Sequence, residues 1–342
     1  MYEVTVGIPV YKAVDYIEAT MESALAQSYP DIEFLVIDDC GDDGSIAVVE
    51  RLQKEHPRGK AIRLLRNKCN LGVGPSRNRI IDEANGNYLY FLDSDDVIEP
   101  HTIDLLVGAA HGHRAEVVYA SFEQIDNVSH SSTKQIVYPP ESFEHLGDLA
   151  CYAFRNYGFF QSSVCNCLID LHFLRTVKLK FIDAVYWEDM AFTYELVTLV
   201  ERAALLPDIT YHYLCRPNSL SNYQERAHLK RDEVLKNVST IDYLKWKCRQ
   251  KTGNSYTPYM CYNLEMNSFY IVSHVLKHRK CIIPEIPDAD LHQMMQMPMS
   301  LGEILRFRHR LLGNLILWAI VKLPTPLFML AVKIMGRIKK II

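Results

Sequence analysis

The sequence predicts an α/β protein with a mostly parallel central sheet flanked by helices, followed by a helical C-terminal region. In the first third, short β-branched and apolar runs alternate with amphipathic helical stretches, which is typical of βαβ units. After residue 227 the pattern is mostly helical. With 342 residues, 49% of them hydrophobic and 23% charged, the chain is long enough for one large domain with an appendage and lies outside the disordered regime.

The elements of the first part follow one another in a regular order. Strands are expected at residues 4–10, 34–37, 62–65, 88–92 and 117–119. Helices are expected at residues 15–27, over a stretch carrying Ile46, Val49 and Leu52, and at residues 75–84. Asp15 is expected to cap the first helix, and Gly86 to close the last one.

The later segments divide the chain into two regions. Residues 124–144 turn polar and predict a hairpin or loop over a ligand crevice. A helix expected at 186–197 carries two acids in its first turn, where the helix dipole favours them, and a strand with a polar loop follows at 209–222. We expect a domain over residues 1–226, with halves at 1–120 and 121–226, and a helical region over residues 227–342.

Polar clusters follow the predicted strands at the points where the strands end. They are Pro9-Val10-Tyr11, Asp38-Asp39, Asp93-Ser94-Asp95-Asp96, and a glycine-bearing loop from Asn70 to Arg77. In open α/β sheets, the loops beyond the carboxyl ends of the strands form the ligand crevice. Four clusters on one rim therefore predict a binding site.

Asp93 and Asp95 stand two residues apart, so in extended backbone their carboxylates point the same way and repel each other. Either solvent must screen the two negative charges, or a bound cation must neutralise them. A hard cation such as Mg²⁺ or Mn²⁺ takes one or two carboxylates and completes its shell with phosphate oxygens and water, which predicts a phosphate-bearing ligand. The sequence lacks the Gly-Lys-Ser/Thr of a P-loop, and its first strand lacks the glycine pattern of a dinucleotide site.

Five segments resemble the family 2 glycosyltransferases, which are nucleotide-sugar-dependent enzymes of the GT-A fold. They are VTVGIPVYK, FLVIDDCGDDGS, NLGVGPSRN, GNYLYFLDSDD and YWEDMAFTYEL, in this order and at these spacings. The resemblance covers about residues 4–221. Its most specific part is the DSDD motif, a DxD type of motif, with a later Glu-Asp pair on a helix.

The resemblance implies a UDP-sugar donor, with a guanine or thymine nucleotide left open. Pro9 and Tyr11 would line the nucleobase pocket, Asp39 would accept the uracil N3 proton, and Arg77 would contact the base or the diphosphate. Lys12 stands where the family usually has asparagine. Taken alone, Tyr11 is as compatible with a core aromatic, Asp39 with a turn cap and Arg77 with a solvated helix cation.

The resemblance also implies the metal site and the catalytic base. Asp93, with Ser94 beside it, would lie near the ribose, and Asp95 would be the direct ligand of the divalent cation. Asp189 would remove the proton of the acceptor hydroxyl in a single inverting displacement, while Glu188 would bind the acceptor. The competing explanation is that these two acids only stabilise a helix start.

The expected activity is that of an inverting, hexosyltransferase-type enzyme in surface or capsular polysaccharide or O-antigen synthesis. Its partners would be a nucleotide sugar and a glycan or lipid-linked glycan acceptor, and a homodimer is left open. The net charge of −4 gives no reason to expect nucleic acid. Two other classes stay open, a non-catalytic nucleotide-sugar-binding protein, which would need no base such as Asp189, and a nucleotidyltransferase.

The C-terminus predicts a membrane contact. Residues 311–321 carry no charge but fall short of the roughly 20 residues that a membrane span needs. Residues 326–342 place Leu327, Leu330, Ile334 and Ile338, with Ala331 and Ile341, on one helical face and the basic residues elsewhere. Such helices lie in the membrane interface, although packing on the protein or on a second subunit is the alternative. Nine scattered cysteines and a start without a signal peptide predict a cytoplasmic setting, and the basic C-terminal segment predicts a peripheral contact with the inner face of the membrane.

Overall fold

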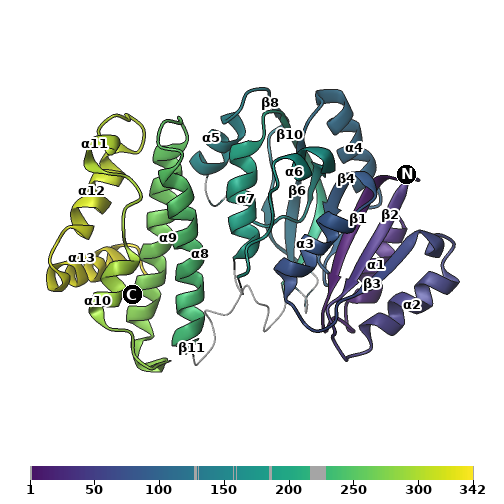
Figure 1. Ribbon diagram of the computed structural model, residues 1–342, viewed down its shortest axis with the longest axis horizontal. Coiled ribbons are helices and arrows are strands. Elements are labelled where there is room, and N and C mark those ends of the chain that lie inside the picture. The colour runs from purple at the N-terminus through teal and green to yellow at the C-terminus, as the bar shows by residue number, and fades with distance from the viewer. Residues whose placement is uncertain are drawn as a thin grey trace. The chain divides into compact units, whose positions relative to one another are not determined.

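The computed structural model describes residues 2–126, 129, 131–156, 158, 160–184, 187–215 and 229–341. The chain forms two compact units (Figure 1). The first comprises Met1–Leu149, Gln161–Asp183 and Glu188–Pro217, and the second comprises Ala150–Phe160, Ala184–Trp187 and Asn218–Ile342. The predicted boundary between residues 226 and 227 and the predicted polar loop after residue 215 lie outside the described residues.

The first unit is built on a sheet of ten strands within the described residues. The strands are β1 (Tyr2–Val10), β2 (Ile32–Asp38), β3 (Ile62–Arg66), β4 (Gly86–Phe91), β5 (Val97–Ile98), β6 (Val117–Asp126), β7 (Ser132–Ile136), β8 (Glu141–Phe143), β9 (Cys167–Asp170) and β10 (Ala203–Cys215). Their order is β3-β2-β1-β4-β9-β6-β10-β5, with β7 paired to β6 and β8 paired to β10. This mixed α/β architecture confirms the predicted fold class.

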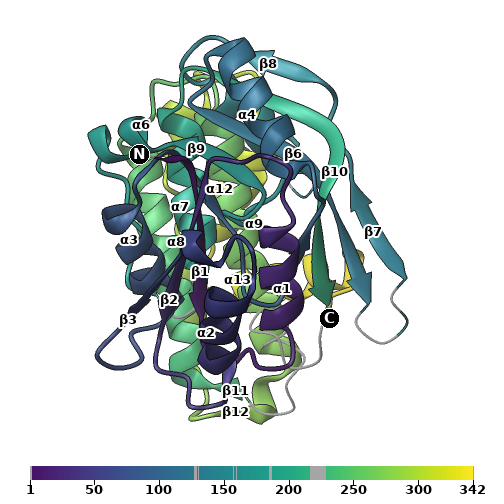
Figure 2. The same ribbon diagram turned by 90° about the vertical axis from the view of Figure 1, so that its right-hand side faces the viewer.

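The sheet is parallel over its first four strands and mixed beyond them. Strands β1 to β4 are joined by parallel pairs, whereas β9 lies antiparallel between β4 and β6. The described helices of this unit are α1 (Ile17–Leu25), α2 (Ser45–Glu55), α3 (Val73–Glu83), α4 (Thr102–His113), α6 (Leu171–Thr176) and α7 (Glu188–Leu199), and α5 (Asp148–Arg155) is divided between the two units. Figure 2 shows α1 and α3 on opposite sides of β1 and β2, as in a doubly wound sheet.

Two local predictions are wrong. Helix α1 begins at Ile17 with Tyr16 as its N-cap residue and no side-chain cap, so Asp15 does not cap it. Gly86 does not close α3 but starts β4, where a Cβ atom would lie 2.5 Å from the backbone nitrogen of Thr5. The glycine is needed because two strands approach closely, a reason that the local sequence does not reveal.

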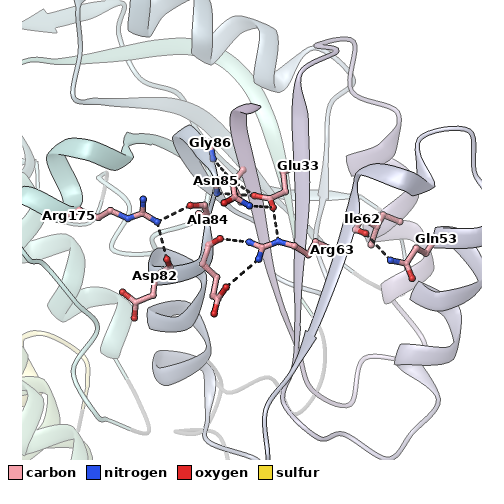
Figure 3. Close-up of polar contacts among 11 residues, drawn as sticks. Glu33, Gln53, Ile62, Arg63, Asp82, Ala84, Asn85, Gly86 and Arg175 are labelled. Carbon is pink, nitrogen blue, oxygen red and sulfur yellow. Dashed lines mark hydrogen bonds and ion pairs between the residues drawn. The ribbon is translucent and has the colours of Figure 1, made fainter. Parts of the chain in front are cut away.

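A buried polar network ties the strands together at the edge opposite the rim (Figure 3). The carboxylate of Glu33 accepts hydrogen bonds from Thr5 Oγ1 (2.8 Å), Arg63 Nε (2.8 Å), and both the backbone and the side chain of Asn85 (3.1 and 2.8 Å). Thr5 Oγ1 in turn accepts from the backbone N–H of Gly86 (2.9 Å). Because these bonds reach β1, β3 and the residue before β4, this carboxylate of β2 fixes the relative positions of β1 to β4.

Residues 124–144 contain the predicted hairpin, since β6 and β7 pair in antiparallel fashion. Its position over a crevice stays a prediction. The described part of the second unit is helical apart from one short strand pair. Its elements are β11 (Leu229–Lys230), α8 (Arg231–Arg249), α9 (Thr257–Lys277), β12 (Ile282–Ile283), α10 (Asp288–Met294), α11 (Leu301–Ile304), α12 (Leu311–Val321) and α13 (Thr325–Ile338). In the described part of the chain, no helix has the length and apolar character to cross a membrane.

Candidate active site

The polar clusters of the predicted rim meet at one edge of the first unit. Val10 pairs with Asp38, and the backbone N–H of Asp39 donates to the carbonyl of Val10 (2.9 Å). Beyond the end of β4, the N–H of Leu92 donates to the carbonyl of Gly7 (3.1 Å). The acids that follow Leu92 therefore emerge beside the ends of β1 and β2, as the parallel pairing requires.

Arg77 is the centre of this site. Its buried guanidinium donates through Nη2 to Asp93 Oδ1 (2.7 Å) and through Nη1 to Glu188 Oε1 (2.9 Å). It thereby links the acid loop after β4 to the first turn of α7, 111 residues further along the chain. Contact of Arg77 with the base or the diphosphate stays a prediction, whereas its observed contacts are with two carboxylates.

Aromatic stacking explains how α7 reaches this position. The ring of Phe181 stacks on Phe192 of α7, with centroids 4.1 Å apart and planes 9° apart. The same ring meets Phe91 of β4 edge-on, with centroids 5.6 Å apart, and lies 5.5 Å from the Arg77 guanidinium. Such contacts are worth about 0.5–1.5 kcal/mol each beyond their burial, so they help to hold the start of α7 against the end of β4.

The two acids of α7 are held in an environment that favours their neutral forms. Burial, and then the neighbouring Asp189, raise the pKa of Glu188 to about 7, although Arg77 opposes the shift. Burial also raises the pKa of Asp189, against the opposing influence of Arg77 and of the Met190 N–H, which donates to its carboxylate (2.7 Å). A carboxylate with a raised pKa is a stronger base than an ordinary one, which suits it to accept a proton.

Asp96, the last acid of the motif, ties the loop after β4 to β10. Its carboxylate is buried and accepts from the Tyr211 hydroxyl (2.5 Å) and from the Leu214 N–H (2.8 Å). Burial, then Asp95 and Asp93, raise its pKa well above the ordinary value. Tyr211 was not predicted as a site residue, although its position in a strand rich in aromatic residues was a usable signal.

Asp39 organises the loop before α3. Its carboxylate accepts from Asn67 Nδ2 (2.7 Å) and from the backbone N–H groups of Leu71 (2.9 Å) and Gly72 (2.8 Å). Of the roughly four acceptor positions of a carboxylate, three are used, so about one is left for a ligand. Asn67 was not predicted, yet it directly follows β3 and the rim argument would have found it. Asp38 has a local role, since its carboxylate accepts from the Cys40 N–H (2.9 Å).

The remaining predicted residues differ in exposure. Tyr11 is 44% exposed, which disfavours the core alternative, and the Lys12 ammonium lies 5.4 Å from its ring centroid. Pro9 is buried within β1, opposite Ile37 of β2, so its contact with a base stays a prediction. Ser94 and Asp95 are both partly exposed in the loop after β4.

The donor set fits a divalent cation that is shared with a ligand. Asp93, Glu188 and Asp189 act electrostatically on the Arg77 guanidinium, and Asp95 and Asp96 lie in the same loop as Asp93. Among the described residues, no three side chains of the metal-binding types are grouped to hold an ion by themselves. Magnesium and manganese sites with one or two carboxylates plus phosphate oxygens need no such group, and the excess of acids would be relieved by a cation.

Comparisons with known proteins place this chain beside glycosyltransferases. The sequence model described as Glycosyl transferase family 2 matches residues 5–174. A succinoglycan biosynthesis protein, ExoO of Rhizobium meliloti (strain 1021), is 26% identical over 292 residues, which cover 81% of this chain and 78% of that protein.

Two solved structures resemble the whole chain. Staphylococcus aureus TarS 1–349 in complex with UDP-GlcNAc aligns with a TM-score of 0.61 at 16% identity, covering 94% of this chain and 90% of that one. The mannosyltransferase PcManGT from Pyrobaculum calidifontis, in complex with GDP-Man and Mn²⁺, aligns with a TM-score of 0.54 at 14% identity, covering 94% and 87%. These likenesses establish the fold, and together with the family match they show that the chain belongs to glycosyl transferase family 2 and has the GT-A fold.

Proposed function

We propose that this chain transfers a sugar from a nucleotide sugar, a UDP-sugar in the first instance, to a hydroxyl group of a glycan acceptor, with inversion of the anomeric configuration. The observation that carries the proposal is the Arg77 bridge, which brings the acid motif after β4 and the acids of α7 into one site. The similarity to a succinoglycan biosynthesis protein supports a role in surface polysaccharide, capsule or O-antigen synthesis.

The donor side of the site has separable tasks. Asp95, with the second carboxylate oxygen of Asp93 and the Ser94 hydroxyl in the same loop, would hold a Mn²⁺ or Mg²⁺ ion. When bound, the cation would neutralise negative charge on the diphosphate leaving group, so no protein acid is required there. Tyr11 offers an exposed ring for stacking on the base, and Asp39 offers its remaining acceptor position to a base N–H.

The acceptor side depends on Asp189. Its carboxylate would remove the proton of the acceptor hydroxyl while that oxygen attacks the anomeric carbon from the face opposite the nucleotide. Glu188, whose pKa is about 7, accepts a hydrogen bond from the Arg77 guanidinium, which also donates to Asp93. Glu188 would bind the acceptor or hold the start of α7 in place. The raised pKa of Asp189 supports its role as the base, because the proton it takes is then held more firmly.

The enzyme would act at the cytoplasmic face of the cell membrane, on a lipid-linked glycan, with peripheral contact through its C-terminal helix. This part of the proposal is supported by the exposed apolar side chains of α13.

A donor screen tests the proposal. Thermal unfolding is measured with UDP-, GDP- and dTDP-sugars, each with and without Mn²⁺, for the parent and for Asp95→Ala. We expect one nucleotide class to raise the melting temperature of the parent only when Mn²⁺ is present, and the variant to lose that response. If no nucleotide sugar stabilises the parent at millimolar concentration, or if the variant responds like the parent, the assigned donor site is wrong.

A further inference from the structure

Helix α13 has two apolar faces on opposite sides. Phe328, Met329 and Val332 are buried and pack within the second unit. A second set of apolar side chains on the same helix is 50–76% exposed, namely Leu327, Leu330, Ile334 and Ile338. With about 3.6 residues per turn, this exposed set falls on one stripe, and the buried set falls on the other side of the helix.

This division bears on the choice left open between packing and membrane binding. A helix that only packs on protein would present polar side chains to solvent. Here the face turned to solvent is as apolar as the packed face, and Lys333 and Arg337 flank the exposed stripe. The predicted amphipathic face is therefore real, while the helix is also part of the fold.

Helix α12 repeats the arrangement. Leu312 is 72% exposed, and Ile316 and Ala319 follow it on the same face at spacings of four and three residues. Its buried residues, Asn314 and Leu317, lie on the other side. Two consecutive helices, separated by three residues, thus each expose an apolar stripe, and neither is long enough to cross a bilayer.

The charge of this region identifies the surface that it fits. Residues 304–342 contain eight lysine and arginine residues and no aspartate or glutamate, in a chain whose net charge is −4. The region therefore carries a formal charge of +8, and the rest of the chain carries −12. A second copy of the same surface would be repelled, whereas an anionic lipid surface attracts each basic residue near it by about 1 kcal/mol.

We propose that α12 and α13 together form one docking surface for an anionic membrane, with both exposed stripes inserted at the headgroup boundary and the basic side chains turned to lipid phosphates. The inference deepens the proposed function. It rests on that function only for the biological purpose of docking, which is to bring the transferase to a lipid-linked acceptor. The docking surface goes beyond a single terminal helix, because it requires α12 as well. Deleting α13 would be an unsuitable test, because Phe328 and Val332 are buried and their loss would disturb the fold.

The test is sedimentation of the full chain with vesicles of phosphatidylglycerol and phosphatidylcholine, or of phosphatidylcholine alone. The parent should bind the anionic vesicles, and binding should weaken between 0.1 M and 1 M salt, where the screening length falls from about 10 Å to about 3 Å. The pairs Ile334→Ser with Ile338→Ser, and Leu312→Ser with Ile316→Ser, should each lower the partition coefficient by at least about tenfold.

The matched control removes exposed apolar side chains elsewhere. Val137→Ser with Leu146→Ser alters two exposed residues of the first unit and should bind vesicles like the parent. Circular dichroism and gel filtration of every variant show that it is folded and report its oligomeric state. The inference is overturned if the parent does not sediment, if the α12 pair binds like the parent, or if the stripe variants change a dimer into a monomer without changing vesicle binding.

Vesicle binding requires neither donor nor acceptor, so the two proposals fail separately. A chain that transfers sugar to a soluble acceptor but ignores anionic vesicles contradicts only the docking surface. A chain that binds vesicles but transfers no sugar from any nucleotide donor contradicts the proposed function and leaves the docking surface standing.

Discussion

Replacing Arg77 by glutamine should destabilise the protein by an amount that grows with pH. The guanidinium contacts Asp93 and Glu188, and its removal leaves two carboxylates without their cation. Breaking a buried pair by removing one partner costs about 3–5 kcal/mol, unless the remaining acid takes up a proton. Glu188 is poised to do so, because its pKa is already about 7 in the presence of Arg77.

The pH dependence can be worked out from that pKa. An acid whose pKa is higher in the folded than in the unfolded protein stabilises the folded protein at low pH. This stabilisation is lost as the pH rises through the folded-state pKa. Between pH 6 and pH 8 the parent should therefore lose roughly 1 kcal/mol through Glu188. In the variant the proton stays bound throughout, so the loss is about twice as large, and the difference between the two proteins grows by roughly 1 kcal/mol.

The assay is urea unfolding followed by circular dichroism at pH 6 and pH 8, with EDTA present to keep cations away. Arg79→Gln is the matched control, because it removes a cation from the same helix whose contacts are the Arg66 carbonyl and the Asn67 side-chain oxygen. Its effect should be the same at both pH values. A cost for Arg77→Gln that is independent of pH, or larger at pH 6, would refute the assigned coupling of Arg77 to Glu188.

Three further predictions concern the metal site, the catalytic base and the Glu33 network. Asp95→Ala should abolish the part of UDP affinity that depends on Mn²⁺, and calorimetric titration giving equal affinities for variant and parent would argue against the metal assignment. Because burial raises the pKa of Asp189, kcat/KM for transfer should rise with pH through that pKa as the carboxylate becomes able to accept a proton, and a rate that falls from pH 5 to pH 7 would exclude this base. Glu33→Ala should cost about 3–5 kcal/mol in urea unfolding, because it leaves polar groups unpaired in the interior. By contrast, Glu83→Ala, which removes an exposed partner of the same Arg63, should cost at most about 1 kcal/mol, and equal costs would contradict the network.

The parallel half of the sheet could be predicted because β1 to β4 are apolar runs separated by helical periods. The short antiparallel strands β5, β8 and β9 could not. They contain two to four residues, which is too few for a periodic pattern, and they form only because a neighbouring strand offers free backbone groups. Gly86 was misassigned for a related reason, since its role depends on β1 and not on its neighbours in the chain.

The residues of the candidate site could be chosen from the sequence, but the network of contacts that joins them could not. The rim argument and the family resemblance selected Asp39, Arg77 and the acids of both motifs. The Arg77 to Glu188 bond spans 111 residues and depends on the stacking of Phe181 on Phe192, which no local pattern encodes. In the same way, the loop contacts of Asp39 could not be read from the sequence, because they join backbone groups.

The C-terminal helices show the limit of periodicity arguments. The apolar pattern of α13 could be recognised, but a pattern alone cannot say which apolar residues meet protein and which meet solvent. Only the packing of Phe328 and Val332 separates the two faces.

The most direct test of the proposed mechanism is the pair of measurements on Asp189→Asn, transfer rate and UDP affinity. Asparagine keeps the shape of aspartate but cannot take up a proton, so transfer should fall by about a hundred- to ten-thousand-fold while the UDP affinity measured with Mn²⁺ stays nearly unchanged. Glu188→Gln should reduce transfer less, and the parent's product should show inverted anomeric configuration by NMR. Full transfer activity in Asp189→Asn would remove this residue from the role of base, and a product of retained configuration would exclude the single displacement.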